Sequence, residues 1–175
     1  MKQFNIIVAC DTQGGIGKNN EMPWPHHKED MRQFRKKTIG NNNNCVIMGY
    51  NTFKSMNEKP LPKRMNYVLT RKKHDLNLEY DNLKFVSSFE NLFKICNETN
   101  YDEYWIIGGG IIYDYFTKNQ LQNINEVHVT FLENSYDCDV FFELDKILNE
   151  TNFSLKSSDK FDNTKFNIYK NIIKL

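Results

Sequence analysis

The chain has 175 residues, of which 39% are hydrophobic and 26% are charged, an ordinary composition for one globular domain with a substantial core. Its formal net charge of +1 gives no strong field that would attract nucleic acid or a membrane surface, so we expect neither as a partner.

The cysteines and the N-terminal residues indicate the compartment. Cys10, Cys45, Cys96 and Cys138 are widely scattered, form no CxxC pair, and no histidine spacing suggests zinc. We therefore expect buried free thiols in a reducing compartment and no metal site. The first apolar run, residues 6–10, is too short for a membrane span and lacks the features of a signal peptide, so we expect a soluble, cytoplasmic protein.

The first predicted elements are a strand and a long loop. Residues 4–10, FNIIVAC, are apolar and rich in β-branched side chains, which is typical of a strand buried on both faces of a parallel sheet. Residues 11–24 form a polar, glycine-containing loop that ends in Met-Pro-Trp and is followed by Pro25. Loops of this length in compact domains are often functional, and we expect residues 14–24 to act as a lid.

A helix is predicted after Pro25 and should end near Gly40, a suitable C-cap. Its apolar face recurs at three- and four-residue spacing and consists of His27, Met31, Phe34 and Thr38. Asp30 lies in the middle of this face, where an ionised carboxylate must find partners or have a raised pKa. Alternatively, Asp30 simply favours the helix dipole near the helix start and is solvated. The run at residues 41–44, four asparagines, reads as a solvent loop.

The rest of the chain alternates strands with helices. Strands are predicted at residues 45–49, 65–70, 83–86, 104–107 and 127–131, and helices at 51–56, after Ser87 or Ser88, and after Gly110. Two last strands at 152–156 and 165–173, with Asp162-Asn163 between them, suggest a hairpin. The glycines at 49 and 108–110 mark either tight turns or close backbone approach to a phosphate at a helix N-terminus.

This order predicts an α/β fold: a single domain over residues 1–175 with a mostly parallel central sheet, an antiparallel C-terminal edge strand and flanking helices. A ligand should lie beyond the carboxyl ends of the strands, where Asp11, Gly49, Arg71 and Gly108 emerge.

Several motifs then occur in one order. Ile7-Val8-Ala9 and GIGKNNEMPWP come first, and Asp30 follows eight residues after Met22. VIMGYNTFKSM, LPKRMNYVLTR, WIIGGGIIY, VHVT and DVFFE follow. In this order and spacing the chain resembles the dihydrofolate reductase family over essentially its whole length. The resemblance implies NADPH-dependent reduction of 7,8-dihydrofolate to tetrahydrofolate, with hydride transfer to pterin C6 and protonation at N5. It also implies antifolate inhibitors as ligands, and we expect a separate monomer.

The resemblance assigns roles to residues on the substrate side. Asp30 would bind the amidine-like edge of the pterin, Thr130 would complete that network, and Arg64 would take the α-carboxylate of the glutamate tail as a fork. The alternative for Arg64 is a solvated surface residue. The implied catalytic residues are Asp30, Met22, Trp24, Thr130 and Tyr113. The implied substrate residues are Asp30, Thr130, Arg64 and an apolar wall of Ile7, Val8, Met31, Phe34, Met56, Leu61 and Ile107, for which ordinary core packing is the alternative.

The implied cofactor residues are Ala9, Ile16, Gly17, Gly49, Tyr50, Asn51, Thr52, Thr70, Arg71, Lys72, Ser87, Ser88, Gly108, Gly109, Gly110, Ile111, Ile112 and Tyr113. Arg71 would meet the 2′-phosphate of NADPH. The family usually carries a basic residue where Tyr50 stands, and many relatives carry arginine where Ser88 stands. Lys72 and Lys73 can compensate, because point charges also hold a phosphate. We therefore expect NADPH to be preferred, by a smaller margin than in relatives with the full basic set.

Two rival functions remain open from the sequence. The reductase of riboflavin synthesis shares the cofactor side of this fold but should lack the Met-Pro-Trp loop with its downstream aspartate. A noncatalytic nucleotide-binding or scaffold protein would keep the glycines but need not keep Asp30 together with Thr130.

Overall fold

The computed structural model describes residues 2–71, 80–150 and 152–172. Lys72 and Lys73, predicted to help hold the cofactor, lie outside the described residues.

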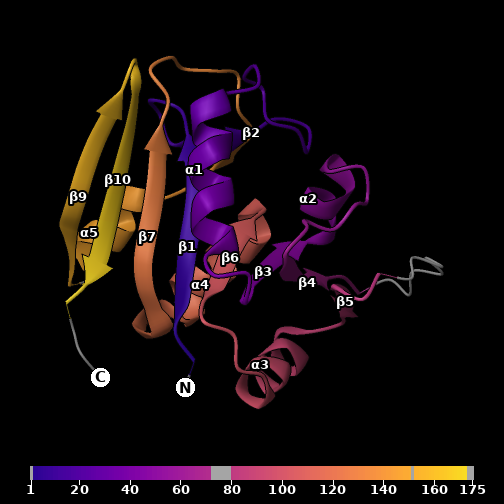
Figure 1. Ribbon diagram of the computed structural model, residues 1–175. Coiled ribbons are helices and arrows are strands. Elements are labelled where there is room, and N and C mark those ends of the chain that lie inside the picture. Colours follow the sequence, from indigo (N-terminus) through magenta and orange to yellow (C-terminus); the bar gives the residue numbers. More distant parts are fainter. Residues whose placement is uncertain (1, 72–79, 151, 173–175) are drawn as a thin grey trace.

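One eight-stranded sheet runs through the molecule in the order β5-β4-β3-β6-β1-β7-β10-β9 (Figure 1). The strands are β1 (Phe4–Cys10), β3 (Asn44–Gly49), β4 (Arg64–Leu69), β5 (Leu83–Val86), β6 (Tyr104–Gly108), β7 (Ile124–Phe131), β9 (Phe153–Phe161) and β10 (Thr164–Asn171). The pairs from β5 to β7 are all parallel, whereas β10 runs antiparallel to both β7 and β9. The predicted parallel sheet with an antiparallel C-terminal edge is confirmed.

Helices cover both faces of this sheet. They are α1 (Lys28–Ile39), α2 (Tyr50–Ser55), α3 (Phe89–Glu98), α4 (Gly110–Asn119) and α5 (Leu144–Glu150), with a 3-10 turn, η1, at Leu121–Asn123. The larger apolar cluster joins β1, β3 and β7 to α3, α4 and α5. The second cluster contains Ile7, Val46, Met48 and Trp105 from the strands and packs against α1 and α2 through Phe34 and Phe53. Figure 1 shows α1 lying in front of β1 and β7.

Strand alternation separates neighbouring residues of β1 onto these two faces. Ile7 belongs to the second cluster and Val8 to the larger one. This is the expected result of a period of two, because successive side chains point to opposite faces of a sheet. The two residues therefore cannot both present side chains to one ligand face.

Three local predictions need correction. The loop at residues 11–24 contains a short strand, β2 (Gly15–Gly17), which pairs with β8 (Val140–Phe141) in a separate two-stranded sheet. Neither β8 nor α5 was predicted, because both are too short for a clear period. Asn44 does not belong to a solvent loop: it is 1% exposed and begins β3.

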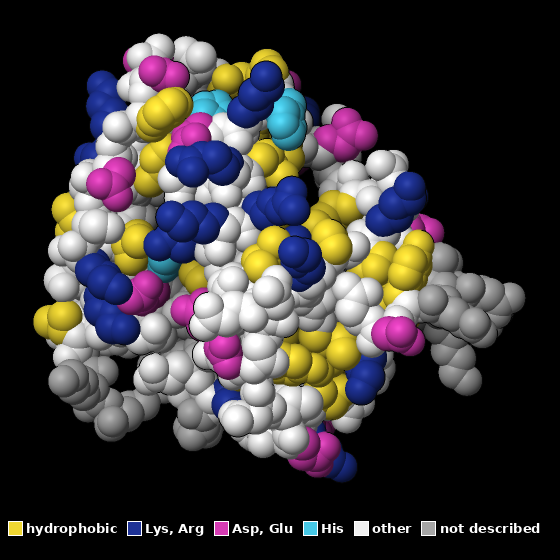
Figure 2. All heavy atoms as spheres, viewed as in Figure 1, with side chains coloured by type: hydrophobic (Ala, Val, Ile, Leu, Met, Phe, Trp, Pro, Cys, Tyr) yellow, Lys and Arg dark blue, Asp and Glu magenta, His cyan; other side chains and the backbone are white. Residues whose placement is uncertain are grey.

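The ends of α1 follow the sequence closely. The helix begins at Lys28 with His27 as N-cap, and Gly40 is the C-cap with a φ of 51° and an N–H that donates to the Lys36 carbonyl. The outer face of α1 carries exposed cations at Lys28, Arg32, Arg35 and Lys36, and the basic side chains over this helix are visible in Figure 2. Across the described ranges, no helix is long and apolar enough to cross a membrane.

Candidate active site

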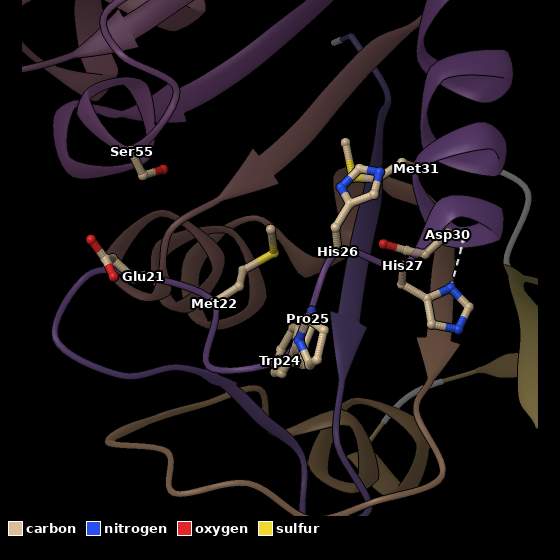
Figure 3. Close-up of a pocket in the computed structure, with 9 residues that line it drawn as sticks. All are labelled: Glu21, Met22, Trp24, Pro25, His26, His27, Asp30, Met31 and Ser55. Carbon is tan, nitrogen blue, oxygen red and sulfur yellow. Dashed lines mark hydrogen bonds between the residues drawn. The ribbon is translucent and has the colours of Figure 1, made fainter.

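A cavity of about 310 Å³ opens where the loop after β2, the first turn of α1 and the end of α2 meet (Figure 3). Its lining consists of Glu21, Met22, Trp24, Pro25, His26, His27, Asp30, Met31 and Ser55. Four of these residues, at positions 22, 24, 30 and 31, were assigned to the site from the sequence. The structure brings them together although they come from a loop and a helix.

Asp30 is the acidic side chain that reaches this cavity from α1. It stands in the first turn of the helix, and Figure 3 shows its carboxyl pointing away from the helix axis into the cavity. Burial raises the pKa of Asp30, while a hydrogen bond from Thr130 on β7 and the nearby His27 ring act in the opposite direction. As predicted, burial disfavours the ionised form of this carboxylate, and the Thr130 hydroxyl partly stabilises that form by hydrogen bonding.

Tyr113 of α4 lies close enough to Asp30 to be affected by its charge. Burial is the largest cause of the raised pKa of Tyr113, and the neighbouring Asp30 carboxylate adds to it. The Tyr113 hydroxyl donates a hydrogen bond of 2.7 Å to the carbonyl oxygen of Ile7. The phenol thus stays protonated and fixes the first turn of α4 against β1.

The predicted apolar wall is largely assembled on one face of the sheet. Ile7 and Ile107 are buried in the second cluster, and Phe34, Met56 and Leu61 are partly buried against it. Met31 is 36% exposed and lines the cavity from α1. The Val8 side chain is in the other cluster, so only its backbone can face this wall.

Arg64 is a buried cation at the start of β4. It is 5% exposed, its Nε donates to the carbonyl oxygen of Pro62 at 3.1 Å, and its Nη1 donates to the hydroxyl of Thr38. Within the described part of the chain, no carboxylate forms an ion pair with it. Burial, with a smaller contribution from the Arg35 charge, lowers the pKa of Arg64 to about 10. The alternative of a solvated surface arginine is wrong, and the guanidinium is a desolvated charge that an anion would stabilise.

The triple glycine forms a narrow cradle against α2. Gly108 has a φ of +126°, which L side chains rarely adopt, and a Cβ on Gly109 would lie 3.1 Å from the Thr52 hydroxyl oxygen. A Cβ on Gly49 would approach the Ile112 side chain at 3.2 Å. Gly109 is the N-cap of α4 and offers no side chain to its first N–H groups. The backbone here can come close to a bound phosphate, which is the geometry that a dinucleotide requires.

Several predicted cofactor residues make internal contacts. The Tyr50 hydroxyl donates to Glu58 at 2.6 Å, and Ser88 caps α3 by accepting a bond of 3.1 Å from the Asn91 N–H. Ser87 accepts from the Asn91 amide at 3.0 Å. Arg71 is exposed directly after β4. The remaining assigned positions line the strand ends and the α4 start: Ala9, Ile16 and Thr70 are partly buried, Gly17 is buried, and Ile111 is 81% exposed.

A buried aspartate that the sequence did not single out for a role organises the start of the loop. Both oxygens of the Asp11 carboxylate accept backbone hydrogen bonds: Oδ1 from Gln13 at 2.8 Å and Gly15 at 2.7 Å, and Oδ2 from Tyr136 at 2.9 Å. Burial opposes ionisation, but these three N–H groups prevail and hold the pKa of Asp11 below its usual value. Asp11 therefore joins the loop to the segment before β8.

Three further hydrogen bonds attach the loop to two other parts of the chain. On one side the Asn19 N–H donates to Asp139 Oδ2 at 3.0 Å, and the Asp139 N–H donates to the Gly17 carbonyl at 2.9 Å. On the other side Asn51 of α2 donates to the Asn20 side chain at 2.8 Å. The loop is thus hydrogen-bonded both to the residue before β8 and to α2.

Among the residues whose placement is described, no group of three or more histidine, cysteine, aspartate or glutamate side chains could hold a metal ion. The four cysteines are free, and three of them are buried. Of the candidate site residues assigned from the sequence, Met22, Trp24, Asp30 and Met31 line the cavity.

Comparison with known proteins agrees with this geometry. A family model described as dihydrofolate reductase matches residues 3–174. The chain is 33% identical over 166 residues to the dihydrofolate reductase of Ureaplasma parvum. This alignment covers 94% of this chain and 96% of that relative. It is 36% identical over 139 residues to the dihydrofolate reductase of Haemophilus influenzae, and this alignment covers 79% of this chain and 78% of that relative. A bifunctional dihydrofolate reductase-thymidylate synthase of Paramecium tetraurelia is 33% identical over 165 residues, covering 94% of this chain and 32% of that relative. With the cavity, the half-buried Asp30 carboxylate that reaches it and the match over nearly its whole length, the chain belongs to the dihydrofolate reductase family.

Proposed function

We propose that the protein reduces 7,8-dihydrofolate to 5,6,7,8-tetrahydrofolate and uses NADPH as the hydride donor. The observation that carries this proposal is Asp30: a desolvated carboxylate that points into the cavity beside an apolar wall, with Thr130 as its hydroxyl partner. A scaffold protein would have no reason to keep a charge there, because burial of an unneeded carboxylate costs stability.

Asp30 would bind and orient the pterin. The amidine-like edge of a pterin presents two adjacent N–H donors, and the two oxygens of one carboxylate match them. This contact leaves N5 and C6 on the far side of the ring, so Asp30 would not touch N5 directly. Its negative charge would favour the protonated pterin, and water would carry the proton to N5 as C6 receives the hydride.

The apolar wall and the loop would keep bulk water away from the reacting atoms. Ile7 and Ile107 belong to one apolar cluster and Phe34 packs against it, and exclusion of water by such a wall would strengthen the field of Asp30. The hydrogen bonds of Asn19 and Asn20 hold this part of the loop to Asp139 and Asn51, and the loop residues Glu21, Met22 and Trp24 line the cavity, which supports a lid that opens for ligand exchange.

Arg64 and Arg35 would read the glutamate tail of the substrate. Arg64 is buried at 5% exposure, and its fork suits the α-carboxylate. Arg35 is exposed on α1 and close enough to lower the pKa of Arg64. A tail with two carboxylates would relieve the repulsion between these two cations.

The glycine cradle fits a dinucleotide pyrophosphate. Gly49, Gly109 and Thr52 would hold it through close backbone approach, as the contacts that a Cβ would make there indicate. Arg71 would supply the charge for the 2′-phosphate. NADPH, when bound, supplies the hydride, and the residues of this chain position the acceptor and protect it from water. We further propose that the enzyme acts as a cytoplasmic monomer.

The test is a direct assay of the purified protein. With dihydrofolate and NADPH together, the near-ultraviolet absorbance of NADPH should fall, and methotrexate should stop the reaction. Asp30→Asn at neutral pH is the matched control, because it keeps the shape of the side chain and removes its charge. No turnover in the unmodified protein, or full turnover in the variant, would contradict the proposal.

A further inference from the structure

The N-cap of α1 is a histidine with both ring nitrogens engaged. His27 Nδ1 accepts a hydrogen bond of 3.2 Å from the backbone N–H of Asp30 (Figure 3). His27 Nε2 lies 2.7 Å from the Thr164 hydroxyl, at the start of β10. Thr164 is 3% exposed, so this second contact is made inside the protein.

These two contacts determine the proton position on the ring. The Asp30 partner is an N–H group, which can only donate, so Nδ1 must carry a lone pair. The ring is therefore neutral, Nε2 carries the hydrogen, and the Thr164 hydroxyl accepts it. The ring thus joins the backbone N–H of Asp30, in the first turn of α1, to the Thr164 hydroxyl on β10. Asp30 is also the residue whose carboxylate reaches the cavity.

The charges around this ring come from α1. Glu29 and Asp30 both respond to the proximity of His27, whereas β10 contributes the uncharged Thr164. The Asp30 carboxylate is also faced by the Thr130 hydroxyl from β7 and the Tyr113 phenol from α4. Of the three described side chains whose interaction with the Asp30 carboxylate is given above, Thr130, Tyr113 and His27, only His27 can become a cation.

We propose that His27 is a positioning residue whose neutral ring holds the main chain of Asp30 and leaves the negative charge of that carboxylate uncompensated for the reaction. This inference rests on the proposed reduction of dihydrofolate. Protonation would turn Nδ1 into a donor, which cannot accept the Asp30 N–H, and would place a cation at the positive end of the α1 dipole. The same cation would offset the field with which Asp30 favours the protonated pterin, so protonation of His27 opposes hydride transfer.

The proposal predicts a particular pH profile. Single-turnover hydride transfer should be measured between about pH 5 and pH 8, the range in which histidine side chains change charge. His27→Asn keeps an N-cap acceptor for the Asp30 N–H but cannot become charged. The ratio of the variant rate to the wild-type rate cancels the titration of the substrate. It should rise about tenfold from pH 8 to pH 5, a smaller effect than the 10²–10⁴ range of acid–base assistance.

His26→Asn is the matched control, because His26 is an exposed histidine that lines the same cavity. The ratio of the His26→Asn hydride-transfer rate to the wild-type rate should stay constant between about pH 5 and pH 8. A flat ratio for His27→Asn, or a rise for His26→Asn alone, would overturn the proposal. His27→Ala should lose rate at every pH because it also removes the cap, and Asn should rescue most of that loss.

A ligand-free measurement separates this inference from the proposed function. Nitrogen NMR of the imidazole should show His27 with Nε2 protonated and Nδ1 unprotonated at neutral pH, and Thr164→Val should keep this tautomer because the Asp30 N–H still donates to Nδ1. The opposite tautomer in the wild-type protein would overturn the inference even if the enzyme reduces dihydrofolate. An inactive wild-type protein with the expected tautomer would instead refute the proposed function.

Discussion

Replacing Arg64 with methionine should have opposite effects on ligand binding and on stability. Met fills a similar volume without the charge. Burial lowers the pKa of Arg64 from 12.5 to about 10 at 5% exposure, and at 1.36 kcal/mol per pKa unit this corresponds to a penalty on the order of 3 kcal/mol. The two hydrogen bonds to Pro62 and Thr38 return roughly 1 kcal/mol each. Arg64→Met should therefore leave the free energy of unfolding unchanged or raise it by about 1 kcal/mol.

Binding should respond in the other direction. A fork to a carboxylate makes two charge-assisted hydrogen bonds, each worth about 1.5–3 kcal/mol. Their loss should weaken dihydrofolate binding by about 3 kcal/mol or more, a factor of at least about 100. Arg35→Met, which removes an exposed cation, should weaken binding by much less.

Calorimetric titration with dihydrofolate and with dihydropteroate, which lacks the glutamate, measures the effect on binding. Thermal unfolding of the free protein measures the effect on stability. Dihydropteroate should bind wild type and Arg64→Met alike. If dihydropteroate binding falls as much as dihydrofolate binding, or if the free variant loses more than about 2 kcal/mol of stability, a range typical of a damaging core change, Arg64 is structural and the reasoning fails.

Three other outcomes are expected. Asp30→Asn should slow single-turnover hydride transfer at pH 7 by about 10²–10⁴, with partial recovery at lower pH where the substrate is protonated by solvent. Because burial raises the folded-state pKa of Asp30, the variant should also be more stable in neutral thermal melts, and this gain should disappear below about pH 3.8, the usual value. Arg71→Ala should raise the KM for NADPH and leave that for NADH unchanged; equal losses in steady-state assays would exclude contact with the 2′-phosphate. Glu126→Gln should destabilise the protein by about 2 kcal/mol, because Glu126 is the shared anion of His128, Lys156 and Lys170, all within 3.4 Å. The hydrogen bond from His128 outweighs the opposing effect of burial and holds the pKa of Glu126 below its usual 4.5. The stability lost in Glu126→Gln, measured by thermal melts, should therefore shrink as pH falls below that value.

The sequence predicted the sheet because its signals are local. Continuous apolar runs such as residues 45–49 mark strands buried on both faces, and the alternation with helices implies parallel pairing. Asp30 was also detectable, since a carboxylate in an apolar stripe violates the helical pattern whatever surrounds it. The short β2 and β8 strands gave no such signal, because three and two residues are too few to show a period.

Only the tertiary structure decided the partners of the polar groups. Arg64 and a surface arginine look alike in sequence, and only the packing of β4 against α1 shows that Arg64 is desolvated and lacks a carboxylate among the described residues. Likewise, His27 reads as part of an apolar stripe until β10 brings Thr164, 137 residues away in sequence, to its Nε2. A chain's periodicity reflects the environment of each residue averaged over its own element, whereas a hydrogen bond depends on two atoms that the fold alone brings together.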